Sequence, residues 1–434
     1  MMCNHFDTSI PPDSNIHKLV KQIVEQWGQD YVDQCNSIDY DCTKLMDDVI
    51  DCGTPEMQKG YIDLLPNGEY GKKKGHRCGN RGCPKCHWIE KNMSVKKKMA
   101  KWPHCSYSLL TLTVPQQLYV LFRYNEEEMY RRLKKSFADA VKEFADKCFG
   151  GLPVFWPVIQ SWNNNMTLHP HLHAALSNGG WRDGKWVEPN HPYWFPYDKI
   201  LEKTKELFLK ALLKDRPLLF HPYKDQSEVY RLLQTHIKQG KKGGWNLDCS
   251  PYGTETITVK DEYGNDKEVP DHTVNLEKLL RYLTRDCLAG HRIVAIDSTY
   301  VTIEYTSRRS KKVITERIRG PKYIELYMLH QLPKGFPRST PYHLLHSSKK
   351  AELKEAKKLF DKQRLESGTF IDRWFEQSEQ VVQEQQEQSS EQCNGGNTFC
   401  GIRTPKPTRI FFQNIRPRKS HFTYGRASPD IPNI

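Results

Sequence analysis

The sequence predicts an α+β protein in which helices pack on a sheet, with a small cysteine-rich module before it and a disordered tail after it. β-branched apolar runs alternate with amphipathic helical repeats across residues 102–348. Cysteines gather before this region, and residues 376–391 after it are dominated by Gln and Glu. We therefore divide the 434 residues into three parts: 1–101, 102–348 with an insertion near 251–271, and 349–434.

Charge and cysteine content narrow the class of protein. Lys and Arg number 65 against 52 Asp and Glu, a net charge of +13, which favours a phosphate-rich partner. No run of 18 apolar residues and no signal peptide is visible, so we expect a cytoplasmic protein with no membrane partner. The 13 cysteines are an odd number without the even spacing of disulfide frameworks, which favours metal ligation.

The elements follow from the local patterns. A helix is expected over residues 16–27 of the module, and the core begins with a β-branched run that Pro115 ends. Apolar residues at helical spacing predict further helices, one of them ended by Gly150. The expected strands are 106–114, 154–162, 169–176, 292–305 and 312–318, the expected helices 133–148, 201–213, 275–286 and 349–375, and a hairpin turn is expected at 261–266. The last 34 residues carry seven basic residues and one acid, which predicts a mobile basic tail.

A first metal-type pattern lies at the end of the module. Cys78, Cys83 and Cys86 are spaced as Cys-x4-Cys-x2-Cys, with a Cys-Pro-x-Cys turn that directs two thiolates to one point, as tetrahedral zinc requires. Cys52 is our choice for the fourth ligand, because a distant thiolate lets zinc organise a polar segment. The rival ligands are Cys42, His76 and His87.

A basic strip surrounds this pattern. Residues 72–101 contain eleven basic residues and one acid, Glu90, interleaved with Trp88 and Trp102. Such a strip neutralises several phosphates, so we expect it to bind DNA. The residues expected to do so are Lys72, Lys73, Lys74, Arg77, Arg81, Lys85, Lys96, Lys97 and Lys98.

A second metal-type pattern is His169-Pro-His171-Leu-His173. Alternation along a strand places the three imidazoles on one face, where His171 and His173 can share one cation. His169 is expected to lie behind the ligands or to face DNA, because Pro170 displaces it from the regular strand. Imidazole alone does not choose the metal, so a structural or hydrolytic zinc site remains an alternative.

The helix expected over residues 275–286 supplies a nucleophile. Tyr282 and Asp286 are four residues apart, which places both on one flank of its apolar stripe. A tyrosine phenolate attacks a phosphodiester when a metal polarises the phosphate. We therefore predict Tyr282 as the catalytic residue and Asp286 as a candidate third metal ligand.

Taken together, these residues resemble the HUH-type rolling-circle transposases of the insertion-sequence-ninety-one group, which carry an N-terminal transposase zinc-binding domain. The similarity runs in order over about residues 50–345. Its segments are RCGNRGCPKC (77–86), LTLTVP (110–115), HPHLH (169–173), WNLDC (245–249), LRYLTR (280–285) and HQLPKGF (330–336).

The resemblance implies a ferredoxin-like HUH nuclease core, an antiparallel sheet with packed helices. It also implies that His171 and His173 hold Mg²⁺ or Mn²⁺ and that Tyr282 attacks one DNA strand, leaving a covalent 5′-phosphotyrosine and a free 3′-OH. The implied partners are single-stranded DNA at the ends of a mobile element and target DNA, in the bacterial cytoplasm at the nucleoid.

Two departures from the family pattern change the expected chemistry. Family members often have a second tyrosine four residues after the first, where this sequence has Asp286, so we expect a single-tyrosine mechanism. A further His and Cys-x2-Cys pair are missing from residues 61–69, so we expect one structural zinc. The alternatives are a rolling-circle replication initiator, a noncatalytic zinc-finger DNA-binding protein and, more weakly, a zinc hydrolase.

Overall fold

The structure is a computed structural model that describes most of the chain up to residue 366. The described residues are 14–35, 38–54, 57, 61–64, 70–74, 77–189, 195–238, 244–260, 265–287, 292–307, 310–366 and 415–416. Nearly all of the charged tail expected after residue 366, and parts of the cysteine-rich module, lie outside these ranges. The described part is a mixed helix and antiparallel-sheet fold, as predicted.

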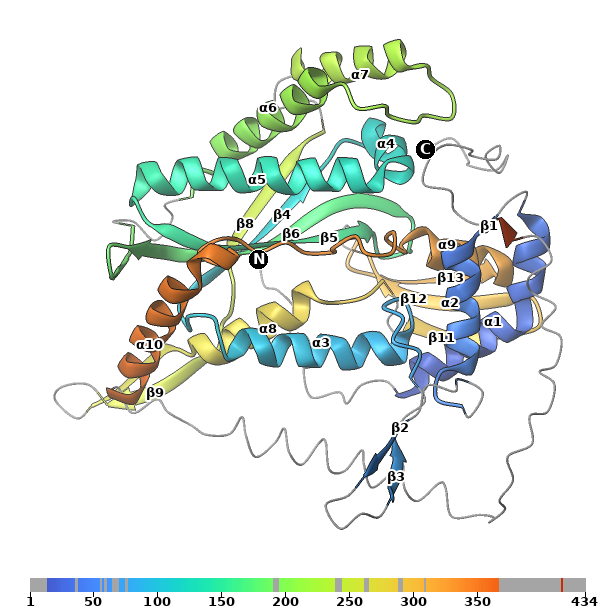
Figure 1. The fold of residues 1–434 in the computed structure, drawn as a ribbon, viewed down its shortest axis with the longest axis horizontal. Coiled ribbons are helices and arrows are strands. Elements are labelled where there is room, and N and C mark those ends of the chain that lie inside the picture. The colour runs from blue at the N-terminus through green and yellow to red at the C-terminus, as the bar shows by residue number, and fades with distance from the viewer. Residues whose placement is uncertain are drawn as a thin grey trace.

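A six-stranded sheet forms the centre of the molecule (Figure 1). Its strands run in the order β14-β5-β6-β4-β8, and β7 pairs with the far end of β6. Every pairing in it is antiparallel. The strands are β4 (Tyr107–Thr113), β5 (Leu152–Trp162), β6 (Leu168–Arg182), β7 (Lys185–Val187), β8 (Asn246–Pro251) and β14 (Tyr342–His343).

The two faces of the sheet differ in polarity because side chains alternate along β6. Leu172, Ala174 and Leu176 belong to the largest apolar cluster, which the helices on one face complete. His171 and His173 project from the other face. Figure 1 shows α5, α6 and α7 on the first face and α3 and α8 on the second. Helices of these layers are α3 (Pro84–Met99), α4 (Tyr119–Tyr124), α5 (Glu126–Cys148), α6 (Tyr197–Asp215), α7 (Gln226–Lys238), α8 (His272–Leu283) and α10 (Lys350–Glu366).

The N-terminal helices share a core with a segment much later in the chain. Helix α1 (Ser14–Gln34) packs on α9 (Gly320–Leu329), and one buried cluster joins both to the sheet β11-β12-β13. The approach is close: a Cβ added at Gly320 would lie 1.9 Å from the Trp27 ring. The other elements here are α2 (Tyr40–Asp51), β1 (Ile38–Asp39), β11 (Ile293–Ile296), β12 (Tyr300–Thr306), β13 (Val313–Arg319) and β15 (Ile415–Arg416).

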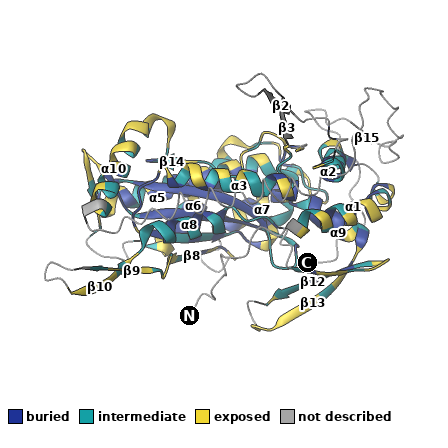
Figure 2. Ribbon diagram, turned by 90° about the horizontal axis from the view of Figure 1, so that it is seen from below, coloured by how far each residue is buried: buried dark blue, intermediate teal, exposed yellow. Residues whose placement is uncertain are grey.

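Two hairpins stand out from the core. Strands β9 (Thr256–Lys260) and β10 (Asp266–Pro270) form the hairpin that the turn signal at 261–266 predicts, and β2 (Tyr61–Leu64) pairs with β3 (Tyr70–Lys74). In Figure 2 the buried sheet is enclosed by helices, whereas β10 and β13 are exposed at the periphery. No helix in the described ranges is both long and apolar enough to cross a membrane.

The structure differs from the sequence-based expectation at several elements. The helix expected to reach Asp286 ends at Leu283, where Thr284 is the C-cap. The region expected to contain two strands, 292–305 and 312–318, contains three, β11, β12 and β13. Helices α7 and α9 were not expected. The charged helix expected over 349–375 is described as α10 over Lys350–Glu366, and residues 367–375 of that expectation lie outside the described residues.

Three histidines predict acid sensitivity. Burial lowers the pKa of His330, His104 and His343 to about 4 in each case. Between pH 6.5 and pH 5 the unfolded chain binds these protons and the native chain does not, so the native state loses stability as the pH is lowered. We expect the free energy of unfolding to drop by about 5 kcal/mol between pH 6.5 and 5, and by about two thirds of that in His330→Gln. Urea unfolding across this range measures the drop, and a flat profile contradicts the assignment.

Candidate catalytic and zinc sites

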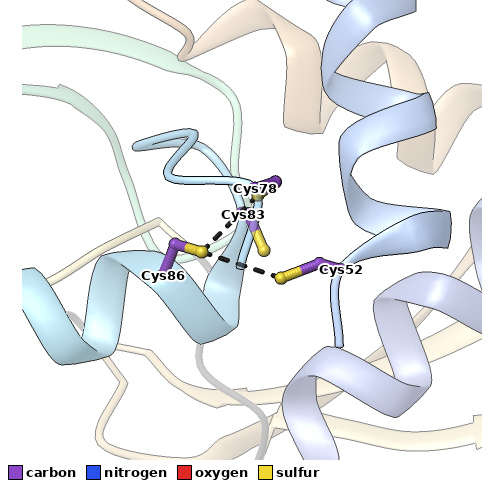
Figure 3. A group of neighbouring side chains, drawn as sticks. All are labelled: Cys52, Cys78, Cys83 and Cys86. Atoms are coloured by element: carbon purple, nitrogen blue, oxygen red, sulfur yellow. Dashed lines mark hydrogen bonds between the residues drawn. The ribbon is translucent and has the colours of Figure 1, made fainter. Parts of the chain in front are cut away.

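Four buried cysteines from three segments meet where α2 ends and α3 begins. The Sγ atoms of Cys52, Cys78, Cys83 and Cys86 all lie within 4.8 Å of one another. Figure 3 shows them pointing toward a common centre, with Cys52 at the end of α2 and Cys86 in the first turn of α3. The structure thus brings our chosen fourth ligand to the three predicted ones.

Local backbone geometry places each thiol. Cys52 is the C-cap of α2, and the chain turns away through Gly53 at φ +90°. Cys83 is the N-cap of α3 with Pro84 directly after it, a favoured start of a helix. Cys86 lies one turn on and accepts a hydrogen bond from the Gly79 amide at 3.3 Å. The Cys-Pro-x-Cys spacing therefore places two thiols at the N-terminus of α3.

The arrangement fits tetrahedral zinc. The Sγ atom of Cys86 lies 3.6 Å from that of Cys52 and 3.5 Å from that of Cys78. Zn–S bonds of about 2.3 Å in a tetrahedron separate sulfurs by about 3.8 Å. Hydrogen bonding to Cys52, followed by its other thiol neighbours and burial, raises the pKa of Cys83, so a cation is needed to hold all four as thiolates. The donor set is that of a structural zinc site.

The rival zinc ligands lie elsewhere or outside the described residues. Cys42 is not part of the group, and His76 falls in an undescribed segment. His87 makes a different contact: its Nε2 lies 3.2 Å from the carbonyl oxygen of Thr284, the C-cap of α8. The residue next to Cys86 therefore joins the cysteine cluster to the helix that carries Tyr282.

The histidine motif lies on β6 with its imidazoles in a row. Ring centroids are 5.1 Å apart for His169 and His171, and 4.8 Å apart for His171 and His173. The Nε2 atoms of His171 and His173 face each other at 3.2 Å. Cis ligands of an octahedral cation at about 2.1 Å are separated by about 3 Å, so this pair has the spacing of two metal ligands.

Oxygen atoms hold the outer nitrogens of both rings. His171 Nδ1 donates to the carbonyl of His169 at 2.7 Å, which leaves the Nε2 lone pair of a neutral ring for a cation. His173 Nδ1 lies 3.0 Å from Thr111 Oγ1 on the neighbouring strand. His169 itself is bound by the Tyr119 hydroxyl at 2.6 Å. The three histidines are thus fixed by strand β4, strand β6 and the segment after β4.

Tyr282 lies beside the histidine pair. Its ring centroid is 5.3 Å from that of His173, and the Arg285 guanidinium stacks over it at 3.8 Å. Asp286 does not join them. Among the described residues, the four cysteines are the one group of three or more His, Cys, Asp or Glu residues whose ligand atoms all lie within 4.8 Å of one another. Because α8 ends at Leu283, Asp286 lies beyond the helix, where its carboxylate accepts from the Cys287 amide at 2.7 Å.

Sequence reasoning missed one polar residue at this site. Gln160 is paired directly with His171 across β5 and β6, so both side chains project from the same face. It is 2% exposed, and its Nε2 has no hydrogen-bond partner among the described residues. A lone Gln within the buried apolar run of β5 was the available signal.

The predicted DNA-binding strip separates into outward and inward residues. Arg77, Lys85, Lys96 and Lys97 are exposed. The Arg81 guanidinium instead donates to the carbonyls of Phe336, Leu332 and Pro333. Lys98 lies over the Trp156 ring at 4.4 Å, and burial lowers its pKa to about 8. Lys72, Lys73 and Lys74 belong to β3, and their side chains lie outside the described part.

Zinc content tests the cysteine cluster. We expect about one zinc per chain in the wild-type protein and almost none in Cys83→Ser, with a loss of several kcal/mol of unfolding free energy because metal binding contributes to folding. Elemental analysis and thermal unfolding measure both. Cys148→Ser on the outside of α5 is the matched control and keeps its zinc. Equal zinc in both variants would rule out the assigned site.

Comparison with known proteins identifies the two parts of this site. A transposase zinc-binding domain model matches residues 23–114, and a model described as a putative transposase matches residues 155–352. A putative transposase of Sinorhizobium fredii, y4qJ, is 22% identical over 336 residues, which cover 75% of this chain and 80% of that protein. No solved structure gives a significant match. The chain is therefore similar to transposases of the insertion-sequence-ninety-one type, both over its cysteine-rich part and over the region that carries the histidine row and Tyr282.

Proposed function

We propose that this protein is a transposase that nicks single-stranded DNA and transfers the strand through a covalent 5′-phosphotyrosine at Tyr282. The observation that carries the proposal is the contact between the Tyr282 and His173 rings, which sets a nucleophile beside a pair of metal-ligand imidazoles. The family match supplies the DNA substrate.

The proposed step exchanges one phosphodiester bond for another. Tyr282 Oη forms a bond to phosphorus as the bond from phosphorus to the 3′ oxygen breaks, and the proton lost by the phenol balances the proton gained by the leaving oxygen. The 5′-phosphate stays on the protein, so the bond energy is retained for rejoining to another 3′-OH. A single tyrosine suffices for this sequence of transfers.

A divalent cation completes the proposed site. His171 and His173 are the residues that would hold Mg²⁺ or Mn²⁺, which when bound polarises the phosphate and offsets its developing charge. The chain's own contribution is orientation: the carbonyl of His169 and the hydroxyl of Thr111 fix the two rings. Asp286 remains a candidate ligand only if it moves, because its side chain is engaged beyond the end of α8.

The zinc module is proposed to hold the DNA strand. Arg77, Lys85, Lys96 and Lys97 give its outer surface positive charge, and β3 adds three further lysines. Phosphate contacts of this kind fix the register of a strand without reading its bases. Such a protein would work on the bacterial nucleoid, on single-stranded DNA at the ends of its element and on target DNA.

Covalent capture tests the nucleophile. With Mn²⁺ and a single-stranded oligonucleotide that contains an end of the element, we expect wild-type protein to form an adduct that carries only the DNA 3′ of the nick. Tyr282→Phe forms none, because the phenyl ring has no nucleophilic oxygen. Denaturing gels with 5′- and 3′-labelled DNA measure this. Tyr252→Phe, whose ring is 6.1 Å from Tyr282, is the control and keeps activity, and an adduct in Tyr282→Phe would overturn the assignment.

Metal dependence tests the histidine pair separately. His171→Ala and His173→Ala should each slow adduct formation about a hundredfold or more at saturating DNA, since the cation supplies several kcal/mol of charge stabilisation. Raising the Mn²⁺ concentration should partly restore the rate. His169→Ala should stay within a few-fold of wild type, and an equal loss in all three variants would point to a structural role for the row.

A further inference from the structure

Helices α3 and α8 lie side by side on the catalytic face of the sheet, in contact at the C-terminal end of α8 (Figure 1). The His87 side chain reaches the Thr284 carbonyl at 3.2 Å, and Arg281 Nη1 donates to Asn92 at 2.8 Å. Lys91 follows His87 by four residues, so it lies one turn further along the same side of α3. This lysine belongs to the zinc module but faces the helix of the catalytic domain that carries Tyr282.

The surroundings of Lys91 are unusually rich in positive charge. Arg281, Arg285 and Arg338 are the cations whose fields act on it, and Asp286 is the acid among its strongest electrostatic neighbours. Arg281 is neutralised by Glu277 at 2.6 Å. Among the described residues no ion pair to Lys91 is found, and Arg338 donates to backbone carbonyls, those of Ile159 at 3.1 Å and of Arg285.

This charge is held where water screens it poorly. Lys91 and the three arginines are all partly buried. Burial, together with Arg281, Arg285 and Arg338, lowers the pKa of Lys91 to about 8. Cations packed together at an interface between two helices repel one another, and an anion placed among them removes that repulsion. The cluster is therefore built to receive negative charge.

Its position relates the cluster to the proposed nucleophile. Arg285, one of the cations next to Lys91, stacks over the Tyr282 ring at 3.8 Å, and that ring lies against His173. A strand whose scissile phosphate is at Tyr282 carries its next phosphates within one or two nucleotides. Lys91 is thus placed to meet a backbone phosphate close to the bond that breaks.

We propose that Lys91 of α3, together with Arg285 of the catalytic domain, binds a backbone phosphate of single-stranded DNA beside the one that Tyr282 attacks. The inference rests on the proposed function for the identity of the strand. In this proposal the zinc module contacts the DNA in two places. Its outward-facing lysines hold the strand, and Lys91 binds it next to the catalytic centre.

Salt-dependent binding tests this proposal without any cleavage. Fluorescence anisotropy with a labelled thirty-nucleotide oligodeoxythymidine, in zinc-loaded full-length protein without Mg²⁺ or Mn²⁺, gives Kd as a function of salt. We expect Lys91→Met to weaken binding about tenfold and to reduce the slope of log Kd against log salt by about 0.7, the value of one phosphate contact on a single strand. Lys91→Arg keeps the slope, and so does Lys142→Met on the opposite face of the sheet.

Thermal unfolding separates this role from a structural one. Removing one of several repelling cations should leave the DNA-free Tm of Lys91→Met unchanged or raise it, whereas a lysine needed for packing of α3 on α8 would lower it. A lower Tm together with an unchanged salt slope would overturn the proposal.

Competitive acetylation gives a readout that is independent of both binding curves and nicking. Brief acetic anhydride labelling followed by mass spectrometry should show Lys91 protected by the oligonucleotide and Lys142 labelled equally with and without it. Equal labelling of Lys91 in both states would refute the phosphate contact even if Tyr282 forms its adduct. Protection of Lys91 in a protein that forms no adduct would keep the phosphate site and reject the nicking chemistry.

Discussion

The contact between α3 and α8 is the constraint on which the histidine-bearing face of the sheet depends. Four cysteines fix where α3 begins, and the next residue, His87, fixes where α8 ends by hydrogen bonding to the Thr284 carbonyl. Tyr282 lies in the last turn of that helix, two residues before the bonded carbonyl. The placement of the tyrosine against the histidine row is therefore set from the zinc module as well as from the sheet.

The two faces of the sheet have different roles: one forms the apolar core and the other carries the histidine row. On the side of α5 and α6, β6 contributes Leu172, Ala174 and Leu176 to a continuous apolar core, and burial of such side chains supplies most of the stability. On the other side the same strand carries His171 and His173, both almost fully buried. Buried polar groups are costly unless they are bonded, and the bonds from His169 and Thr111 meet that need. One apolar face thus supports a polar one.

The sequence predicted the parts of the fold whose signals are local. Alternation and helical spacing identified the strands around β6, helix α5 and the three-histidine face, and the Cys-x4-Cys-x2-Cys spacing identified the zinc knuckle. Tertiary contacts carried no such signal. Arg81 reads as a DNA-binding residue in a basic run, yet it donates to three carbonyls of a loop some 250 residues away. Asp286 has helical spacing to Tyr282, but α8 stops three residues earlier.

The same limit applies to the division of the chain. Cysteine content and polarity indicated a separate module over residues 1–101. Such local patterns carry no information about long-range contacts, and so they could not show that α1 packs on α9. Gln160 and Lys91 were missed for a related reason: each is an ordinary polar residue until the register of β5 and β6, or the packing of α3 on α8, gives it neighbours.

The close packing of Trp27 on Gly320 has a consequence for synthesis of the chain. About 290 residues separate the two, so at about 5–20 residues per second the apolar stripe of α1 leaves the ribosome roughly 15–60 s before α9 exists. During that interval Val20, Ile23 and Val24, all buried in the finished structure, have no partner from α9. Such an exposed apolar stripe is prone to aggregation in a nascent chain. Helix α1 can pack on α9 only after the nearly 290 residues between them have been made.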